Sequence, residues 1–259
     1  MIPILLSAVF YLLAPQLKQA EVTVGEVPQK LRDKLKLDPF YEKHAAYKGY
    51  PILASKKVSD AALLEARFLI ARMLADRDDL VKALIENKSR LVVMAPDEQT
   101  TDVPEQRNMT PKDYWDKRAR GLGGRIASCG EENLLNLKGD RYRNENILIH
   151  EFSHTIAGYG LKTVDPKFDE KLKRCYAKAI DAGLWKDTYA ATNAGEYWAE
   201  AVQSYFDCNA PKGGIHNDIN TNAKLKTYDP EVYELIDDVF KKSQFRYVRY
   251  DKREMNRNN

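Results

Sequence analysis

His150-Glu151-Phe152-Ser153-His154 is the stretch that decides how this chain is interpreted. It has the form H-E-x-x-H, in which two imidazoles one helical turn apart can both reach a single metal ion. The chain has 259 residues and only four histidines, and two of them lie here. Neutral imidazoles bind zinc through nitrogen, and Glu151, about 100° around the helix from His150, can reach a water on the metal. The segment therefore predicts a zinc site rather than a surface helix with two hydrogen-bonded histidines and a solvated glutamate.

The residues around this segment predict a helix. Asn144 can cap its N-terminus, and apolar residues recur every three or four positions from Ile147 to Ile156. Gly158 or Gly160 is the expected end of the helix, because glycine commonly terminates helices. His150 and His154 should therefore both lie on one face of a regular helix.

A catalytic zinc site needs a third protein ligand, and the best candidate lies downstream. The segment 192–206 predicts a helix capped by Thr192 or Asn193. Glu196 and Glu200 are four residues apart and share one face of that helix. We expect Glu196 to be the third ligand and Glu200 to accept the free N–H of a ligand histidine, as outer carboxylates commonly do. The simpler alternative, a solvated acidic pair, leaves two like charges without a cation.

The same region resembles a known family. Residues 189–201 have the sequence Y-A-A-T-N-A-G-E-Y-W-A-E-A. Together with H-E-x-x-H, this sequence resembles the glutamate-zincin metallopeptidases, in particular the family of the anthrax lethal factor catalytic domain. In that family a tyrosine precedes the ligand glutamate in Y-x-x-T-N-x-x-E-a-a-A-E-A, where each a is aromatic. The likeness covers about residues 147–207, and the two motifs together are more specific than H-E-x-x-H alone.

The resemblance implies an α+β fold of the zincin-like metallopeptidase type. We expect a mixed upper lobe, with a small β-sheet and the active-site helix, and a mainly helical lower lobe. The resemblance also implies one Zn²⁺ per chain, held by His150, His154 and Glu196. Glu151 would be the general base, and Tyr189 would donate a hydrogen bond to the oxyanion. The implied activity is hydrolysis of peptide bonds, and we expect an endopeptidase because no motif for binding a substrate terminus is present.

Two of these residues have open alternatives. Tyr189 is one of fifteen tyrosines and has the ordinary interpretation of a core or surface residue. His216 is a rival for the donor role or for another substrate contact, because its loop at 213–218 could fold over the cleft. The simpler interpretation of His216 is a solvated loop histidine.

The rest of the chain predicts both lobes. We expect an edge strand within 121–137, where peptidases of this type hold the substrate backbone by adding it to the sheet. The other predicted elements are helices at 60–75, capped by Asp60, and at 80–86, 166–182 and 229–242, and a buried strand at 90–96.

The N-terminus predicts a secreted protein. Residues 1–20 resemble a signal peptide, because the apolar run at 2–14 is too short to span a bilayer. We expect cleavage after Ala20, an extracellular location and no stable membrane association after cleavage. Residues 21–259 would form one metallopeptidase domain with two lobes divided near 158–165 and a basic, flexible tail at about 244–259.

Secretion makes a disulfide bond feasible. The three cysteines allow one bond in three pairings, and we favour Cys129 with Cys208, which leaves Cys175 free.

The charge composition of the chain limits which classes of partner molecule we expect it to bind. The formal net charge of +3 is too small to argue for nucleic acid. The expected partner is a peptide or protein substrate, and we expect a monomer. The alternative function is a non-catalytic secreted, zinc-bearing binding protein or a toxin-like component on the same fold. Glu151 argues against it, because a binding module does not need a general base.

Overall fold

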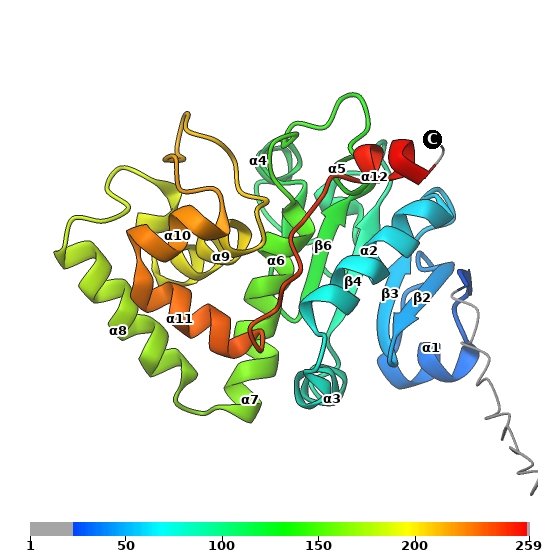
Figure 1. Cartoon of the computed structure of the whole chain (residues 1–259). Helices are drawn as coiled ribbons and strands as arrows, with labels where there is room; N and C mark the ends of the chain where they lie inside the picture. The colour runs from blue at the N-terminus through cyan, green and yellow to red at the C-terminus, as the bar shows by residue number, and fades with distance from the viewer. Residues whose placement is uncertain (1–22, 258–259) are drawn as a thin grey trace, which may run out of the picture.

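The structure is a computed structural model that describes residues 23–257, so the predicted signal peptide at 1–20 lies outside the described residues. The described chain forms a sheet lobe and a helical lobe, with helix α6 (Ile147–Thr155) between them (Figure 1). The expected α+β class with a small mixed sheet is confirmed.

The sheet lobe contains a sheet with strand order β1-β2-β3-β4-β6-β5. The pairs β3–β4 and β4–β6 are parallel, and the other pairs are antiparallel. The strands are β1 (Gly25–Glu26), β2 (Lys43–Tyr47), β3 (Tyr50–Ala54), β4 (Arg90–Met94), β5 (Gly121–Leu122) and β6 (Ile126–Gly130). The buried strand predicted at 90–96 is confirmed as β4, and β5 is an edge strand within the predicted region.

Strand β4 separates two apolar cores because successive side chains point to opposite faces of a sheet. Leu91 and Val93 join the main core, to which α2 and α6 also contribute. Val92 and Met94 join a smaller core on the opposite face. Burial on both faces explains why this strand is continuously apolar after Arg90.

The helices of the sheet lobe include those predicted at 60–75 and 80–86, together with three that were not predicted. They are α1 (Gln29–Leu35), α2 (Asp60–Met73), α3 (Asp78–Glu86), α4 (Lys112–Arg118) and α5 (Glu131–Leu134), with a 3-10 turn at Thr100–Asp102. The cap of α2 is Ser59 rather than the predicted Asp60, because the Ser59 hydroxyl accepts a hydrogen bond from the Ala62 N–H.

Helix α6 differs from its prediction at both ends. The cap is Asn146 rather than Asn144, and its side chain accepts a hydrogen bond from the Ile149 N–H at 3.0 Å. The helix does not end at a glycine but continues as a π-helical segment η2 (Ile156–Leu161) and the short α7 (Lys162–Val164). At Gly160 a Cβ would lie 3.2 Å from Leu80 Cδ2, so this glycine allows η2 to pack closely on α3 instead of terminating the helix.

The helical lobe begins after α7, next to the predicted lobe boundary. It contains α8 (Phe168–Asp181), a 3-10 turn η3 (Tyr189–Ala191), α9 (Ala194–Tyr205), α10 (Asn222–Tyr228) and α11 (Pro230–Val239). The helices predicted at 166–182 and 229–242 are present as α8 and α11. Asp229 caps α11 as expected and also accepts hydrogen bonds from Trp185 Nε1 and the Tyr197 hydroxyl, which ties α11 to the core of this lobe.

The C-terminal segment is packed against the body, so the prediction of a flexible tail is wrong for its described part. It runs from the helical lobe across α6 to α12 (Tyr250–Arg257), which lies near α2 (Figure 1). The Tyr247 N–H donates to the Phe206 carbonyl at 2.7 Å. Arg253 forms an ion pair with the buried Glu65 of α2. The segment therefore contacts both lobes, through the Tyr247 backbone on the helical side and Arg253 on the sheet side.

The predicted disulfide between Cys129 and Cys208 is also wrong. Cys129, Cys175 and Cys208 are all free and buried. Cys129 belongs to β6, and the Cys208 thiol donates to the Gln203 carbonyl after the end of α9. Burial raises the pKa of the thiols of Cys129 and Cys208, so each is an uncharged core residue.

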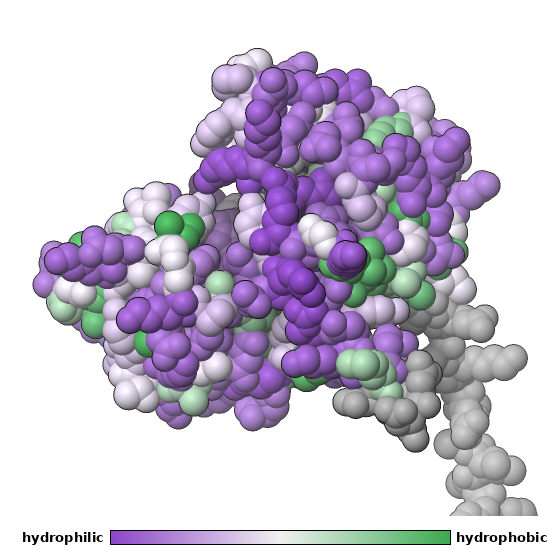
Figure 2. Space-filling view, turned by 90° about the horizontal axis from the view of Figure 1, so that it is seen from above, coloured by the Kyte–Doolittle hydropathy of each residue, from purple (hydrophilic) through white to green (hydrophobic). Residues whose placement is uncertain are grey.

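Apolar residues are concentrated inside the molecule. The face in Figure 2 is mainly hydrophilic, and the apolar residues visible on it form small separate groups. Within residues 23–257, no helix has the length and apolar character needed to cross a membrane.

The buried Arg120–Glu132 pair supplies a stability prediction. The Glu132 carboxylate accepts bonds from Arg120 Nε and Nη2 at 2.6 and 2.8 Å, and both side chains are at most 10% exposed. Glu132→Ala should lower the free energy of unfolding by about 3–5 kcal/mol, because it leaves a buried guanidinium without its carboxylate. Urea denaturation measures this loss. Asp97→Ala, which breaks the exposed pair with Lys57, is the control and should change little; equal effects would contradict the prediction.

Candidate active site

Helices α6 and α9 bring three predicted metal ligands together. His150 Nε2 lies 3.3 Å from His154 Nε2 and 3.2 Å from Glu196 Oε2, and His154 Nε2 lies 3.5 Å from the same carboxylate oxygen. Ligands at zinc's usual bond lengths of about 2.0–2.2 Å, in tetrahedral geometry, are separated by about 3.3–3.6 Å. The three donor atoms are therefore spaced as the ligands of one zinc ion would be.

The local sequence explains why Glu196 points at the histidines. Asn193 is the cap of α9, and its side chain accepts hydrogen bonds from the N–H groups of Gly195 and Glu196 at 2.8 and 3.0 Å. Trp198 Nε1 donates to the Ser153 carbonyl at 3.0 Å and links α9 directly to α6. The start of α9 is thus fixed in rotation and in distance from the H-E-x-x-H helix.

The hydrogen bond expected from Glu200 to a ligand histidine is made by Gln203 instead. His150 Nδ1 lies 2.8 Å from Gln203 Oε1 and 3.7 Å from the nearer oxygen of Glu200. Because an amide oxygen only accepts, the contact places a proton on Nδ1 and leaves Nε2 free for a metal. Gln203 was missed in the sequence, although it lies seven residues, or about two turns, after Glu196 and so shares its helix face.

Glu200 instead holds His216. Its Oε2 lies 3.1 Å from His216 Nδ1 and accepts a hydrogen bond of 3.1 Å from Asn209 Nδ2. The His216 side chain is 15% exposed, so it is not the solvated loop histidine of the simpler interpretation. The bond to Glu200 raises the pKa of His216.

The charges around His150 favour a cation. Burial acts to lower the pKa of His150, but the bond to Glu196 and the charges of Glu151, Glu200 and Glu196 outweigh it and raise this pKa to about 10. The Glu151 carboxyl is half-buried, and its partial loss of solvent raises its pKa. Groups that hold a proton on an imidazole so strongly would also favour a metal ion among them.

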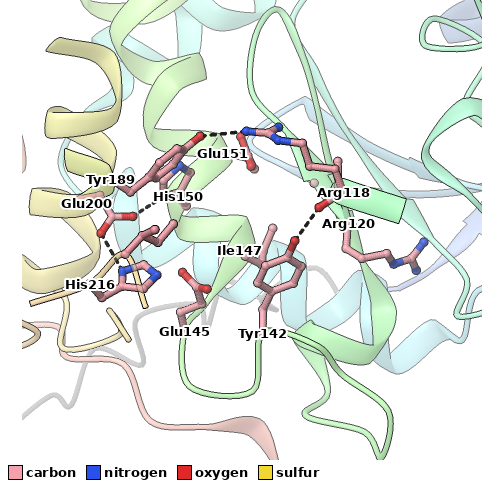
Figure 3. Close-up of a pocket in the computed structure, with 13 residues that line it drawn as sticks. Arg118, Arg120, Tyr142, Glu145, Ile147, His150, Glu151, Tyr189, Glu200 and His216 are labelled. Carbon is pink, nitrogen blue, oxygen red and sulfur yellow. Dashed lines mark hydrogen bonds and ion pairs between the residues drawn. The ribbon is translucent and has the colours of Figure 1, made fainter. Parts of the chain in front are cut away.

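Tyr189 and Arg118 face each other across the site. Tyr189 lies on η3, its ring stacks near His150 with centroids 6.3 Å apart, and its backbone N–H donates to the Ile215 carbonyl at 2.8 Å. Arg118 Nη2, at the end of α4, donates to the Tyr189 hydroxyl at 3.4 Å (Figure 3). Arg118 was not predicted, because a single arginine at the end of a short helix carries no sequence signal for a site.

Two glycines let the sheet approach the site helix. A Cβ at Gly123 would lie 2.7 Å from His154 Cβ, and one at Gly121 would lie 2.4 Å from Ile147 Cγ2. Only glycine leaves room for this contact, so the edge strand β5 lies directly beside α6. The edge of the sheet thus lies next to the helix that carries both histidines.

A cavity of about 250 Å³ adjoins these groups. His150, Glu151 and Tyr189 form part of its wall, and Gly121, Glu145, Glu200 and His216 continue it (Figure 3). The structure thus brings all of the predicted site residues into one region, with Glu196 and His154 beside His150.

Comparison with known proteins shows a similarity of fold. The sequence matches no known family profile and no curated protein. The structure is similar to that of PPEP-2, a Pro-Pro endopeptidase from Paenibacillus alvei, with a TM-score of 0.50 and 18% sequence identity. The match covers 73% of this chain and 96% of the endopeptidase chain. The two proteins therefore share a fold over nearly the whole of that endopeptidase.

Gln203 gives a prediction about metal affinity. Gln203→Ala should weaken zinc binding by about 10- to 100-fold, because the hydrogen bond that orients a ligand histidine is lost. Competition with a zinc chelator measures the change. Gln106→Ala, which removes another buried glutamine, bonded to Ser128 and away from the histidines, is the control. An unchanged zinc affinity in Gln203→Ala would show that Gln203 does not support zinc binding by orienting His150.

Proposed function

We propose that the protein is a secreted zinc-dependent metallopeptidase that cleaves peptide bonds as an endopeptidase. The observation that carries this proposal is the triangle of donor atoms of His150, His154 and Glu196, with sides of 3.2–3.5 Å, beside the half-buried carboxyl of Glu151. The resemblance of its two motifs to the lethal factor family supports the same activity. The shared fold with a protein named an endopeptidase is further support.

Each group has a role that matches its surroundings. Zinc, when bound, supplies a Lewis acid for the scissile carbonyl and makes water reactive near neutral pH. Glu151 takes the proton of the attacking water and passes it to the leaving amine, a task for which a carboxyl with a raised pKa is suited. Tyr189 donates its phenolic hydrogen to the developing oxyanion. Glu200 positions His216 at the cavity wall, where the imidazole can contact substrate.

The site fits catalysis better than binding alone. A zinc-bearing binding protein or toxin-like component would need the ligands but neither Glu151 nor Tyr189. Here Glu151 and Tyr189 both line the cavity next to His150.

The proposed extracellular location rests on the signal-like sequence of residues 1–20. N-terminal sequencing of the protein from its host medium would test cleavage after Ala20.

Replacing the base tests the enzyme directly. Glu151→Gln should abolish cleavage of a diverse peptide library, because the amide cannot accept the proton of water, while zinc content stays at one per chain. Mass spectrometry reads the cleavage, and elemental analysis reads the zinc. The exposed Glu170→Gln on α8 is the control and should cleave like the parent. Cleavage by the Glu151→Gln variant would show that Glu151 is not the base. If the parent cleaved none of the peptides, the alternative of a non-catalytic zinc-bearing binding protein would be favoured.

Tyr189 is tested by removing one oxygen. Tyr189→Phe should lower kcat by about 10²- to 10³-fold, because a donor to the oxyanion is lost. KM and zinc content should stay close to those of the parent, since the bond forms mainly in the transition state. Tyr233→Phe on α11, away from the cavity, is the matched control. A kcat near that of the parent would return Tyr189 to a structural role and leave His216 as the donor.

A further inference from the structure

The cavity beside His150 extends past the groups proposed for catalysis. Its lining runs from Glu151 and Tyr189 to Glu145, Glu200 and His216. Because these residues line one cavity, a peptide whose scissile bond lay between Glu151 and Tyr189 would have a neighbouring side chain close to this space. The part of the lining formed by Glu145, Glu200 and His216 is here named the acidic wall.

The acidic wall has more negative than positive groups. Donor atoms of its three residues lie within 4.8 Å of one another. His216 balances one carboxylate, through its 3.1 Å contact with Glu200. Glu145 is bonded by the neutral amide of Gln203 at 3.3 Å, and within residues 23–257 it forms no ion pair with a lysine or arginine. Burial raises the pKa of Glu145, and the nearby His216 and His150 oppose this rise without cancelling it.

The remaining lining suits a long side chain with its charge at the end. Ile147, Tyr142 and Ile215 line the cavity and offer apolar surface to a methylene stem. Arg118 lies on the opposite side, beside Tyr189, and repels a cation close to the scissile bond (Figure 3). Arg120 adds no free charge to the cavity, because its guanidinium is bonded to Glu132 and to the carbonyls of Glu98 and Ala95.

We propose that this cavity receives a lysine or arginine side chain of the peptide substrate, whose cation binds Glu145 and Glu200. The inference rests on the proposed peptidase function and names its substrate class. A neutral side chain would leave the Glu145 carboxylate desolvated without a counter-charge, which disfavours neutral residues. Glu145 is thus a specificity-determining residue.

Glu145 can be changed without disturbing its loop, because backbone bonds hold its position. The Glu145 N–H donates to the Tyr142 carbonyl, and the Glu145 carbonyl accepts from Asn133. The experiment compares the full chain with Glu145→Gln and Glu145→Lys on peptides that differ only at the residues flanking the cleaved bond. Thermal unfolding and zinc content check that each variant is folded and loaded. Asp218→Asn, an exposed carboxylate two residues after His216, is the matched control.

The expected result is a preference of the parent for lysine or arginine on one side of the cleaved bond. Glu145→Gln should lower kcat/KM for those peptides by about 10- to 100-fold, because Glu200 remains, and should spare neutral peptides. Glu145→Lys should shift the preference towards glutamate or aspartate. The inference would be overturned if the parent cleaved peptides without a preference for basic residues, or if Glu145→Gln left that preference intact. Either result would leave the proposed peptidase function in place.

A binding measurement separates the two proposals. If the parent cleaves nothing, calorimetry of zinc-loaded Glu151→Gln with lysine-containing peptides shows whether the cavity binds them. Binding that Glu145→Gln weakens would support the basic subsite without the peptidase, and absence of binding would overturn both. Two zinc ions per parent chain, falling to one in Glu145→Gln, would instead assign the acidic wall to a metal and overturn the inference.

Discussion

The packing of α9 against α6 is the constraint on which the site depends. A zinc ion accepts ligands only within a few tenths of an ångström of their ideal positions, and the two proposed ligand helices are separated by about forty residues of chain. The Trp198 bond to the Ser153 carbonyl and the Asn193 cap set the distance and rotation of α9. As a result, one oxygen of Glu196 reaches both imidazoles. Without this packing, the H-E-x-x-H helix would present two histidines and no third ligand.

Charge is the second organising feature of the cleft. Glu145, Glu151, Glu196 and Glu200 all lie around His150, and their combined field explains why its pKa is raised despite burial. One of these carboxylates is buried and three are half-buried, so bringing them together is costly unless cations pair with them. In our proposals one cation is the metal and another is carried by the substrate. Arg118 and the paired Arg120 lie on the opposite side, so the cavity has a polarity along which a substrate can be oriented.

The local features of the fold could largely be predicted from the sequence. The continuous apolar run of β4, the Asp229 cap of α11 and the helix at 60–75 all follow from period, capping and burial, which act over a few residues. The predictions were wrong where contacts between segments far apart in the sequence determine the local structure. Gly160 was expected to end a helix, but it lies inside η2, where Leu80 of α3 packs against the Gly160 backbone. The basic C-terminal segment was expected to be flexible, but Arg253 forms an ion pair with Glu65, which lies 188 residues earlier in the sequence.

The same division applies to the site. The sequence by itself determined which chemistry is available: two histidines at a spacing of four, a glutamate between them, and a second acidic segment with a tyrosine before it, because these patterns depend only on helix geometry. Only the tertiary structure decided that Gln203 rather than Glu200 bonds His150, that Glu200 is turned towards His216, and that Arg118 meets Tyr189. Those contacts join residues from separate elements. Their distances depend on how whole helices pack, which the spacing along one helix does not encode.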